Sequence, residues 1–122
     1  MTRAAGALIW DGTRVLTIKR YKDGALGLPC GKVEMGESNR DAAIREVLEE
    51  TGYKVSIPEF QCPYMDHDGN TPVYVFQVET YTHSDTFEGV EGEVLWADPE
   101  DLVQDSRFGE FNRKVLQWYK VL

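Results

Sequence analysis

The 122-residue chain is predicted to fold as an α/β protein in which a mixed sheet is flanked by helices. Short runs rich in Val, Ile, Thr and Tyr recur along the chain with turn residues between them, which is typical of strands. One acidic segment in the first half and one segment at the end repeat apolar residues with the period of an amphipathic helix. Strands and helices in this mixed order favour a sheet covered by helices.

The first elements follow from turn and cap residues. Residues 4–10 and 14–20 are apolar runs on either side of Asp11-Gly12, so we expect a β-hairpin there. Residues 21–27 form a glycine-containing loop that we expect to border a site. A helix is predicted over residues 39–51, capped by Ser38 or Asn39 and stopped by Gly52.

The second half is predicted to add strands and a closing helix. The expected elements are a strand at 55–57 ended by Pro58, a hairpin of 61–65 and 73–82 through 66–70, a strand at 93–97, a helical turn at 99–103 and a helix over 108–122.

Composition sets the class of protein. We expect one domain over residues 1–122, with 42% hydrophobic residues and no apolar run of membrane-spanning length. The N-terminal apolar stretch is too short for a secretory signal, and the only cysteines are Cys30 and Cys62, so a reduced cytoplasmic protein is expected. A net charge of −8 argues against non-specific nucleic-acid binding but permits a small phosphorylated substrate. The sequence leaves monomer and homodimer open.

The helix predicted over 39–51 has two distinct faces. Residues with i, i+3, i+4, i+7 spacing form the face expected to pack on the sheet: Ile44, Val47, Leu48 and Thr51. Three carboxylates with i, i+3, i+4 spacing share a direction about half a turn away: Glu46, Glu49 and Glu50.

Such a cluster of carboxylates is unfavourable without a counter-charge. Like charges three and four residues apart destabilise a helix, and Glu49 and Glu50 lie near its negative end. Within the helix only Arg45 is near enough to offset this repulsion. A divalent cation with oxygen ligands, Mg²⁺ or Mn²⁺, resolves the conflict and indicates an enzyme acting on phosphates. The alternative is a solvated acidic face without a metal.

The spacing of these residues resembles the Nudix box, G-x5-E-x7-R-E-U-x-E-E-x-G-U with U a bulky aliphatic residue. All of its fixed positions are present: Gly31, Glu37, Arg45, Glu46, Glu49, Glu50 and Gly52. Leu28-Pro29 before the box and a Trp-bearing strand after it agree with the family. The resemblance implies a Nudix-type α/β/α sandwich with a mixed central sheet, Mg²⁺ as cofactor with Mn²⁺ able to substitute, and hydrolysis of a nucleoside diphosphate linked to another group.

Two residues depart from the family pattern. Tyr53 stands where an aliphatic residue ends the box, and we expect only local repacking. Cys30 stands where the family has a second glycine whose backbone carbonyl binds the metal. Any residue can supply that carbonyl, although a positive φ would strain Cys30.

The resemblance assigns roles within the box. Glu46, Glu49 and Glu50 bind the metal together with the carbonyl of Cys30, and Glu46 is alternatively the base that takes a proton from water. Arg45 orients the glutamates, and Glu37 supports the loop and metal from behind. An ion pair that only anchors the helix explains Arg45 and Glu37 equally well. Gly31 and Gly52 support the loop and the helix end.

Outside the box the resemblance suggests one more glutamate, in the loop before the Trp-bearing strand, as metal ligand or base. Glu91 is the first choice and Glu93 the second, with Glu88 also qualifying; each alone is otherwise a surface charge. We expect Arg20 and Lys32 to contact phosphates. No role is assigned to His67 or His83. Trp10, Trp96 and Trp118 are expected in the core.

The small chain is similar to nucleotide-sanitising family members that cleave nucleoside triphosphates, including oxidised dGTP, to the monophosphate and pyrophosphate. In those enzymes the segment ahead of the last helix helps to read the base, and Phe111 and Asn112 fall there; a cap or turn explains Asn112 as well. ADP-ribose, nucleotide sugars, dinucleoside polyphosphates and capped RNA remain alternative substrates. A nucleotide sensor without activity is the alternative from another class.

Overall fold

The structure is a computed structural model that describes residues 2–84 and 91–122. Its elements in chain order are β1 (Ala4–Leu8), β2 (Val15–Arg20), β3 (Leu26–Gly27), β4 (Cys30–Lys32), α1 (Asn39–Thr51), β5 (Tyr53–Ser56), β6 (Tyr64–Asp68), β7 (Thr71–Gln77), β8 (Thr80–His83), β9 (Gly92–Ala97), α2 (Pro99–Val103) and α3 (Gly109–Trp118). None of the helices in the described part of the chain has the length and apolar character needed to span a membrane.

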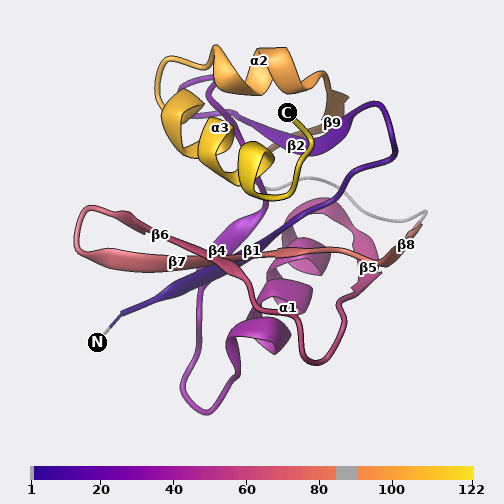
Figure 1. Ribbon diagram of the computed structural model, residues 1–122, viewed down its shortest axis with the longest axis vertical. Coiled ribbons are helices and arrows are strands. Elements are labelled where there is room, and N and C mark those ends of the chain that lie inside the picture. Colours follow the sequence, from indigo (N-terminus) through magenta and orange to yellow (C-terminus); the bar gives the residue numbers. More distant parts are fainter. Residues whose placement is uncertain (1, 85–90) are drawn as a thin grey trace.

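A mixed sheet lies at the centre of the molecule. Its strand order is β4-β1-β7-β6, with β1 and β7 parallel and the other pairs antiparallel. Helix α1 covers one face, and α2 and α3 lie on the opposite side (Figure 1). Two smaller antiparallel ladders, β3-β2-β9 and β5-β8, flank it. This arrangement confirms the predicted mixed sheet between helices.

The core is divided by the central sheet into two clusters. On the α1 side, Ala5 and Ala7 of β1 pack with Val47 of the helix. On the α3 side, Leu8 packs with Val115 and other apolar residues of that helix and of β7. Alternate residues of β1 therefore enter opposite clusters, as the two-residue period of a strand requires. Burial on both faces holds β1, and with it β4, firmly in place.

The expected hairpin of residues 4–10 and 14–20 is wrong in its pairing. The turn forms, because the Asp11 carboxylate accepts hydrogen bonds from the backbone N–H groups of Thr13 and Arg14 at 2.7 and 2.6 Å. However, β1 and β2 enter different ladders and meet only at a bridge between Trp10 and Val15. Both edges of β1 are already taken by β4 and β7, so β2 pairs with β3 and β9 instead.

Other boundaries shift for related reasons. The strand expected at 55–57 begins at Tyr53, directly after the α1 cap. The second hairpin is tighter than expected, since residues 66–68 belong to β6, and residues 80–83 leave β7 to pair with β5. The strand and the helical turn expected at 93–97 and 99–103 are confirmed as β9 and α2.

The closing helix is shorter than the predicted 108–122, because α3 ends at Trp118. Trp118 is also not a core residue. Its side chain is 57% exposed and its ring lies 5.3 Å from that of Tyr64. In contrast, Val115 and Leu116 of the same helix are fully buried, so the predicted amphipathic pattern holds for its core face.

Candidate active site

Helix α1 forms over the predicted residues because both of its ends are capped. The Ser38 hydroxyl accepts a hydrogen bond from the Asp41 backbone N–H at 3.0 Å, which satisfies one free donor of the first turn. Gly52 ends the helix in the left-handed conformation at φ 76°, where a residue without Cβ is favoured. The caps fix the register of the glutamates relative to the sheet.

The face of α1 that packs on the sheet differs from the predicted one. Leu48 of the expected apolar stripe is 39% exposed, and the buried residues are Ala42, Ala43, Val47 and Thr51. The two small alanines let the helix lie against β1, which turns the buried face toward the side of Glu46 and Glu50. These two glutamates therefore border the core, and the expectation that all three point away from it is wrong.

Strand β4 lies against the carboxylates of α1. A Cβ atom added to Gly31 would overlap the carboxylate of Glu46, so only glycine leaves room for that side chain. The backbone N–H of Cys30 donates a hydrogen bond to the carboxylate of Glu50. Cys30 does not adopt a positive φ, so this departure from the family brings no backbone strain of that kind.

Arg45 is the centre of an ion-pair network above this strand. Its guanidinium donates two hydrogen bonds to the Glu37 carboxylate, at 2.8 and 3.0 Å, and one each to Glu46 at 2.9 Å and Glu49 at 3.1 Å. It also donates to the backbone carbonyl of Lys32 at 3.0 Å. Arg45 thus joins the helix, the loop before it and β4, and it orients two of the three glutamates.

Within the described residues, Glu37 is linked to the glutamates of α1 only through Arg45. One of its oxygens accepts a hydrogen bond from the backbone N–H of Glu34 at 3.0 Å, which closes the loop ahead of α1. Hydrogen bonds from Arg45 and from this N–H lower the pKa of Glu37 to about 2. Glu37 is therefore ionised at neutral pH and fixes the position of Arg45.

The electrostatics of Glu46 and Glu50 reflect burial without enough positive charge. Burial, and then the carboxylates of Glu46 and Glu91, raise the pKa of Glu50 to about 9. Burial also raises the pKa of Glu46, although Arg45 offsets part of that effect. Glu50 and Glu91 share a hydrogen bond, which two carboxylates can form only when one of them carries a proton.

These residues fit a divalent cation. One carboxylate oxygen of Glu50 is buried and has no hydrogen-bond partner among residues 2–84 and 91–122, which is costly unless a donor or a cation completes it. The neighbouring groups are all oxygen donors, the type preferred by Mg²⁺ and Mn²⁺. Glu49 is instead 57% exposed and bonded to Arg45, and no three side chains of the described residues already converge as a ready-made metal cage.

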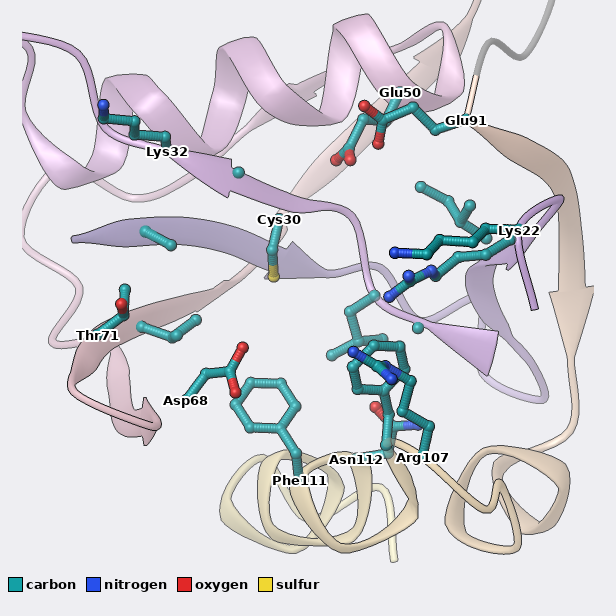
Figure 2. Close-up of a pocket in the computed structure, with 18 of the residues that line it drawn as sticks. Lys22, Cys30, Lys32, Glu50, Asp68, Thr71, Glu91, Arg107, Phe111 and Asn112 are labelled. Carbon is teal, nitrogen blue, oxygen red and sulfur yellow. The ribbon is translucent and has the colours of Figure 1, made fainter. Parts of the chain in front are cut away.

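Of the downstream glutamates, the structure brings Glu91 to the site. Glu91 lies beside Glu50 (Figure 2) and interacts with it. Glu91 is also close enough to raise the pKa of Glu46. Glu93 lines a different hollow, beside Tyr53 and Trp96, and does not join the cluster. Glu88 lies outside the described residues.

A pocket of about 940 Å³ opens next to the glutamates. Glu50 and Glu91 stand at one end, and Phe111 and Asn112 of α3 form the opposite wall (Figure 2). The expected loop of residues 21–27 borders this pocket as predicted, although Leu26 and Gly27 form the short strand β3.

Cationic side chains line the pocket of this acidic protein. Arg20 and Lys32, which were predicted to contact phosphates, both lie on its wall. Sequence reasoning missed Lys22 and Arg107, which also line it. Arg20 and Arg107 lie over the ring of Phe108, at 5.3 and 5.4 Å from its centroid, and both pair with Asp23. Lys22 sits in the predicted site loop, which was a usable signal, whereas Arg107 had none.

Asn112 is fully buried and is not a helix cap or an exposed turn residue. Its amide nitrogen donates to the backbone carbonyls of Leu26 and Leu102, both at 3.0 Å, and so ties α3 to β3 and α2. Asp68 at the end of β6 also lines the pocket and was not predicted, and its neighbour His67, given no role from sequence, lies on the same rim.

Comparison with known proteins agrees with the geometry. A family model described as NUDIX domain matches residues 1–119. The Uncharacterized Nudix hydrolase YvcI of Bacillus subtilis (strain 168) is 30% identical over 109 residues, which are 84% of this chain and 69% of that protein. A solved structure from a study of MutT from Aliivibrio salmonicida and Vibrio cholerae has a TM-score of 0.72 and 29% identity, covering 96% of this chain and 94% of that one.

Matches over less of the chain carry names with different substrates. They are a Putative 8-oxo-dGTP diphosphatase of Bacillus subtilis (strain 168), an RNA pyrophosphohydrolase of Dinoroseobacter shibae and an ADP-ribose pyrophosphatase of Saccharomyces cerevisiae, over 38%, 43% and 46% of this chain. The family match over nearly the whole chain is the common finding. Together with the carboxylate cluster, it shows that the chain belongs to the Nudix hydrolase family.

Proposed function

We propose that this protein hydrolyses a nucleoside triphosphate, with oxidised dGTP among the candidates, to the monophosphate and pyrophosphate with Mg²⁺, for which Mn²⁺ can substitute. One observation carries this proposal. The half-buried carboxylates of Glu50 and Glu91, with that of Glu46 beside Glu50, lie at one end of a cation-lined pocket that is large enough for a nucleotide.

The cation would be held by the glutamates of α1 and by one more from the segment leading into β9. Glu50 offers a buried oxygen to which no described residue donates a hydrogen bond, and Glu46 and Glu91 lie beside it. To bind the same cation, the Glu49 carboxylate would have to break its hydrogen bond with Arg45. The backbone carbonyl of Cys30 would be the remaining oxygen ligand. When bound, the cation neutralises phosphate charge and makes a water molecule a better nucleophile. Glu46, with its raised pKa, is also the candidate base for that water.

Arg45 and Glu37 act as positioning residues in this proposal. The hydrogen bonds of Arg45 hold Glu46 against Gly31 and keep Glu49 close by. Glu37 holds Arg45 in turn, so the network fixes where the carboxylates can place a cation.

The rest of the pocket would hold the substrate. Arg20 and Lys32 would contact phosphate oxygens, since charge-assisted hydrogen bonds from arginine and lysine suit phosphate. The wall formed by Phe111 and Asn112 would hold the nucleoside. The names of the shorter-matching relatives differ in substrate, so they support a nucleotide in general and not one particular leaving group.

The test is turnover on a panel of substrates with Mg²⁺ and with Mn²⁺, scored by the identity of the products. The panel contains nucleoside triphosphates, oxidised dGTP, ADP-ribose, nucleotide sugars, dinucleoside polyphosphates and capped RNA. We expect pyrophosphate and a monophosphate from at least one triphosphate. Glu50→Gln should lower kcat by about 100-fold or more while the protein stays folded. Glu100→Gln, which changes a carboxylate on α2 outside the pocket, should leave it unchanged.

Each contrary outcome has a definite meaning. Cleavage of ADP-ribose or a sugar nucleotide alone would replace the proposed substrate class while keeping the chemistry. Tight nucleotide binding without cleavage of any substrate would make the protein a sensor and overturn the proposal.

A further inference from the structure

Arg3 stands directly before β1 and contacts both ends of the loop that joins β4 to α1, residues 33–38. Its backbone carbonyl accepts a hydrogen bond from the Val33 N–H at 2.9 Å, where the loop begins. Its half-buried side chain reaches the other end of the loop. There Nε donates to the side-chain oxygen of Asn39 at 2.6 Å, and a terminal nitrogen donates to the backbone carbonyl of Glu37 at 3.2 Å. Arg3 therefore holds the loop where it leaves the sheet and where it enters the helix.

The loop itself depends on hydrogen bonds more than on packing. Among residues 33–38, only Val33 is buried. A turn closes the exposed tip, because the Glu37 N–H donates to the Glu34 carbonyl at 3.1 Å and the Glu34 N–H donates to the Glu37 carboxylate at 3.0 Å. With so little apolar contact, the place of Glu37 is set by its hydrogen bonds, and the bond from Arg3 is the one that ties its backbone to β1.

Glu37 links this loop to the carboxylates of the site. Its side chain accepts two hydrogen bonds from Arg45, at 2.8 and 3.0 Å, and Arg45 in turn donates to Glu46 and Glu49. A shift of the Glu37 backbone would move the carboxylate against which Arg45 is held. Since a misplacement of about 1 Å in a catalytic group can cost about 100-fold in rate, a small shift of the loop would reach the chemistry.

We propose that Arg3 is a positioning residue of the reaction, which holds Glu37 in place and, through Glu37 and Arg45, fixes the carboxylates of Glu46 and Glu49. This inference rests on the proposed function and adds to it a residue outside the box. Among the described residues, the Arg3 side chain donates to none of the carboxylates of α1, so its effect on them is indirect.

A double-mutant cycle on kcat with Mg²⁺ tests the link through Glu37. Arg3→Met keeps the apolar stem and removes the donors, so kcat should fall by about 10-fold with KM nearly unchanged. In a Glu37→Ala background the link is already broken, and Arg3→Met should then lower kcat by less than about twofold. Arg40→Met is the matched control, because the half-buried Arg40 also donates to a backbone carbonyl, that of Ile57 at 2.9 Å, and it should leave kcat within about twofold.

Arg3 also lines the pocket, so a direct contact with substrate phosphate is the alternative role. Arg3→Lys separates the two roles, since lysine keeps the charge but lacks the planar fork that reaches two acceptors. We expect Arg3→Lys to lose most of the kcat that Arg3→Met loses. A rise in KM that Arg3→Lys restores, or a loss of kcat that persists in the Glu37→Ala background, would overturn the inference.

Two further measurements need no turnover. In the metal-free protein, Arg3→Met should make the backbone N–H groups of Glu34 and Glu37 exchange with solvent about 10-fold faster, whereas Arg40→Met should not. Mn²⁺ affinity, followed by electron paramagnetic resonance, should fall by about 10-fold in Arg3→Met alone.

Unchanged exchange together with unchanged Mn²⁺ affinity in Arg3→Met would overturn this inference and leave the proposed function intact. If the wild-type protein cleaves no nucleotide, the proposed function fails, and the exchange and Mn²⁺ measurements still decide whether Arg3 positions the carboxylates.

Discussion

Replacing Glu50 with glutamine is expected to stabilise the protein when no divalent cation is present, and to do so more at pH 8 than at pH 5. Burial, and then the carboxylates of Glu46 and Glu91, raise the pKa of Glu50 from 4.5 to about 9. The folded protein therefore keeps a proton on Glu50 that the unfolded chain has already released. The free energy of unfolding falls as the pH rises from about 4.5 through about 9.

The size of the effect follows from the same pKa difference. Inside this window, the free energy of unfolding falls by about 1.4 kcal/mol per pH unit when the folded protein holds one proton more than the unfolded chain. The three units between pH 5 and pH 8 correspond to an upper limit of about 4 kcal/mol, and solvent contact at the pocket reduces the expected value to about 2–3 kcal/mol. Glutamine avoids this cost because its neutral amide can accept from the Cys30 N–H and donate to Glu91.

The assay is urea unfolding of the metal-free protein at pH 5 and pH 8 with a chelator present. Glu49→Gln is the matched control, because it removes a carboxylate from the same helix at a side chain that is 57% exposed. Glu50→Gln should gain stability over wild type at pH 8 and little at pH 5, while Glu49→Gln should show no such difference. If the free energy of unfolding depends on pH in the same way in wild type and in Glu50→Gln, burial does not raise the pKa of this carboxylate and the argument is refuted.

Three further perturbations test other parts of the site. Gly31→Ala puts a methyl group where the Glu46 carboxylate lies, so turnover with Mg²⁺ should fall by about 10- to 100-fold, measured by product release. Arg45→Lys keeps the charge but loses the two-pronged bond to Glu37, so urea unfolding should show a loss of about 1–3 kcal/mol. A pKa of about 2 means that Glu37 stabilises the fold above about pH 4.5 and loses this effect as the pH falls toward 2. The advantage of wild type over Glu37→Gln in urea midpoint should therefore be present at pH 6 and shrink by pH 2.5.

The sequence was most informative where local rules decide the structure. Helix α1 begins and ends as predicted because the Ser38 hydroxyl and the left-handed Gly52 are local caps, independent of the rest of the fold. The glutamate cluster could be predicted for the same reason, since helical spacing alone makes Glu46, Glu49 and Glu50 neighbours. The family could also be predicted, because the box is defined by residue types at fixed spacing along the chain.

Tertiary packing decided what the sequence did not predict. Periodicity placed Leu48 in the core, but the small Ala42 and Ala43 allow a closer approach to β1 and turn Leu48 outward. The pairing of β2 depended on which strands had already taken the edges of β1, and this is not a local property.

The pocket residues show the same limit. Asp68 and Arg107 come from distant parts of the chain. They line the same pocket only because β6 and the segment before α3 both border it. Asn112 was predicted from resemblance to the family, yet the role of its amide in tying α3 to β3 and α2 could be read only from the structure.

The central claim is that the carboxylates beside β4 bind a divalent cation. It is tested most directly by titrating the protein with Mn²⁺ in the presence of a nucleoside monophosphate, with free Mn²⁺ followed by electron paramagnetic resonance. Wild type and Glu100→Gln should bind alike, and Glu50→Gln should bind about 10- to 100-fold more weakly. Equal Mn²⁺ affinity in all three proteins, or no binding in any of them, would contradict the claim.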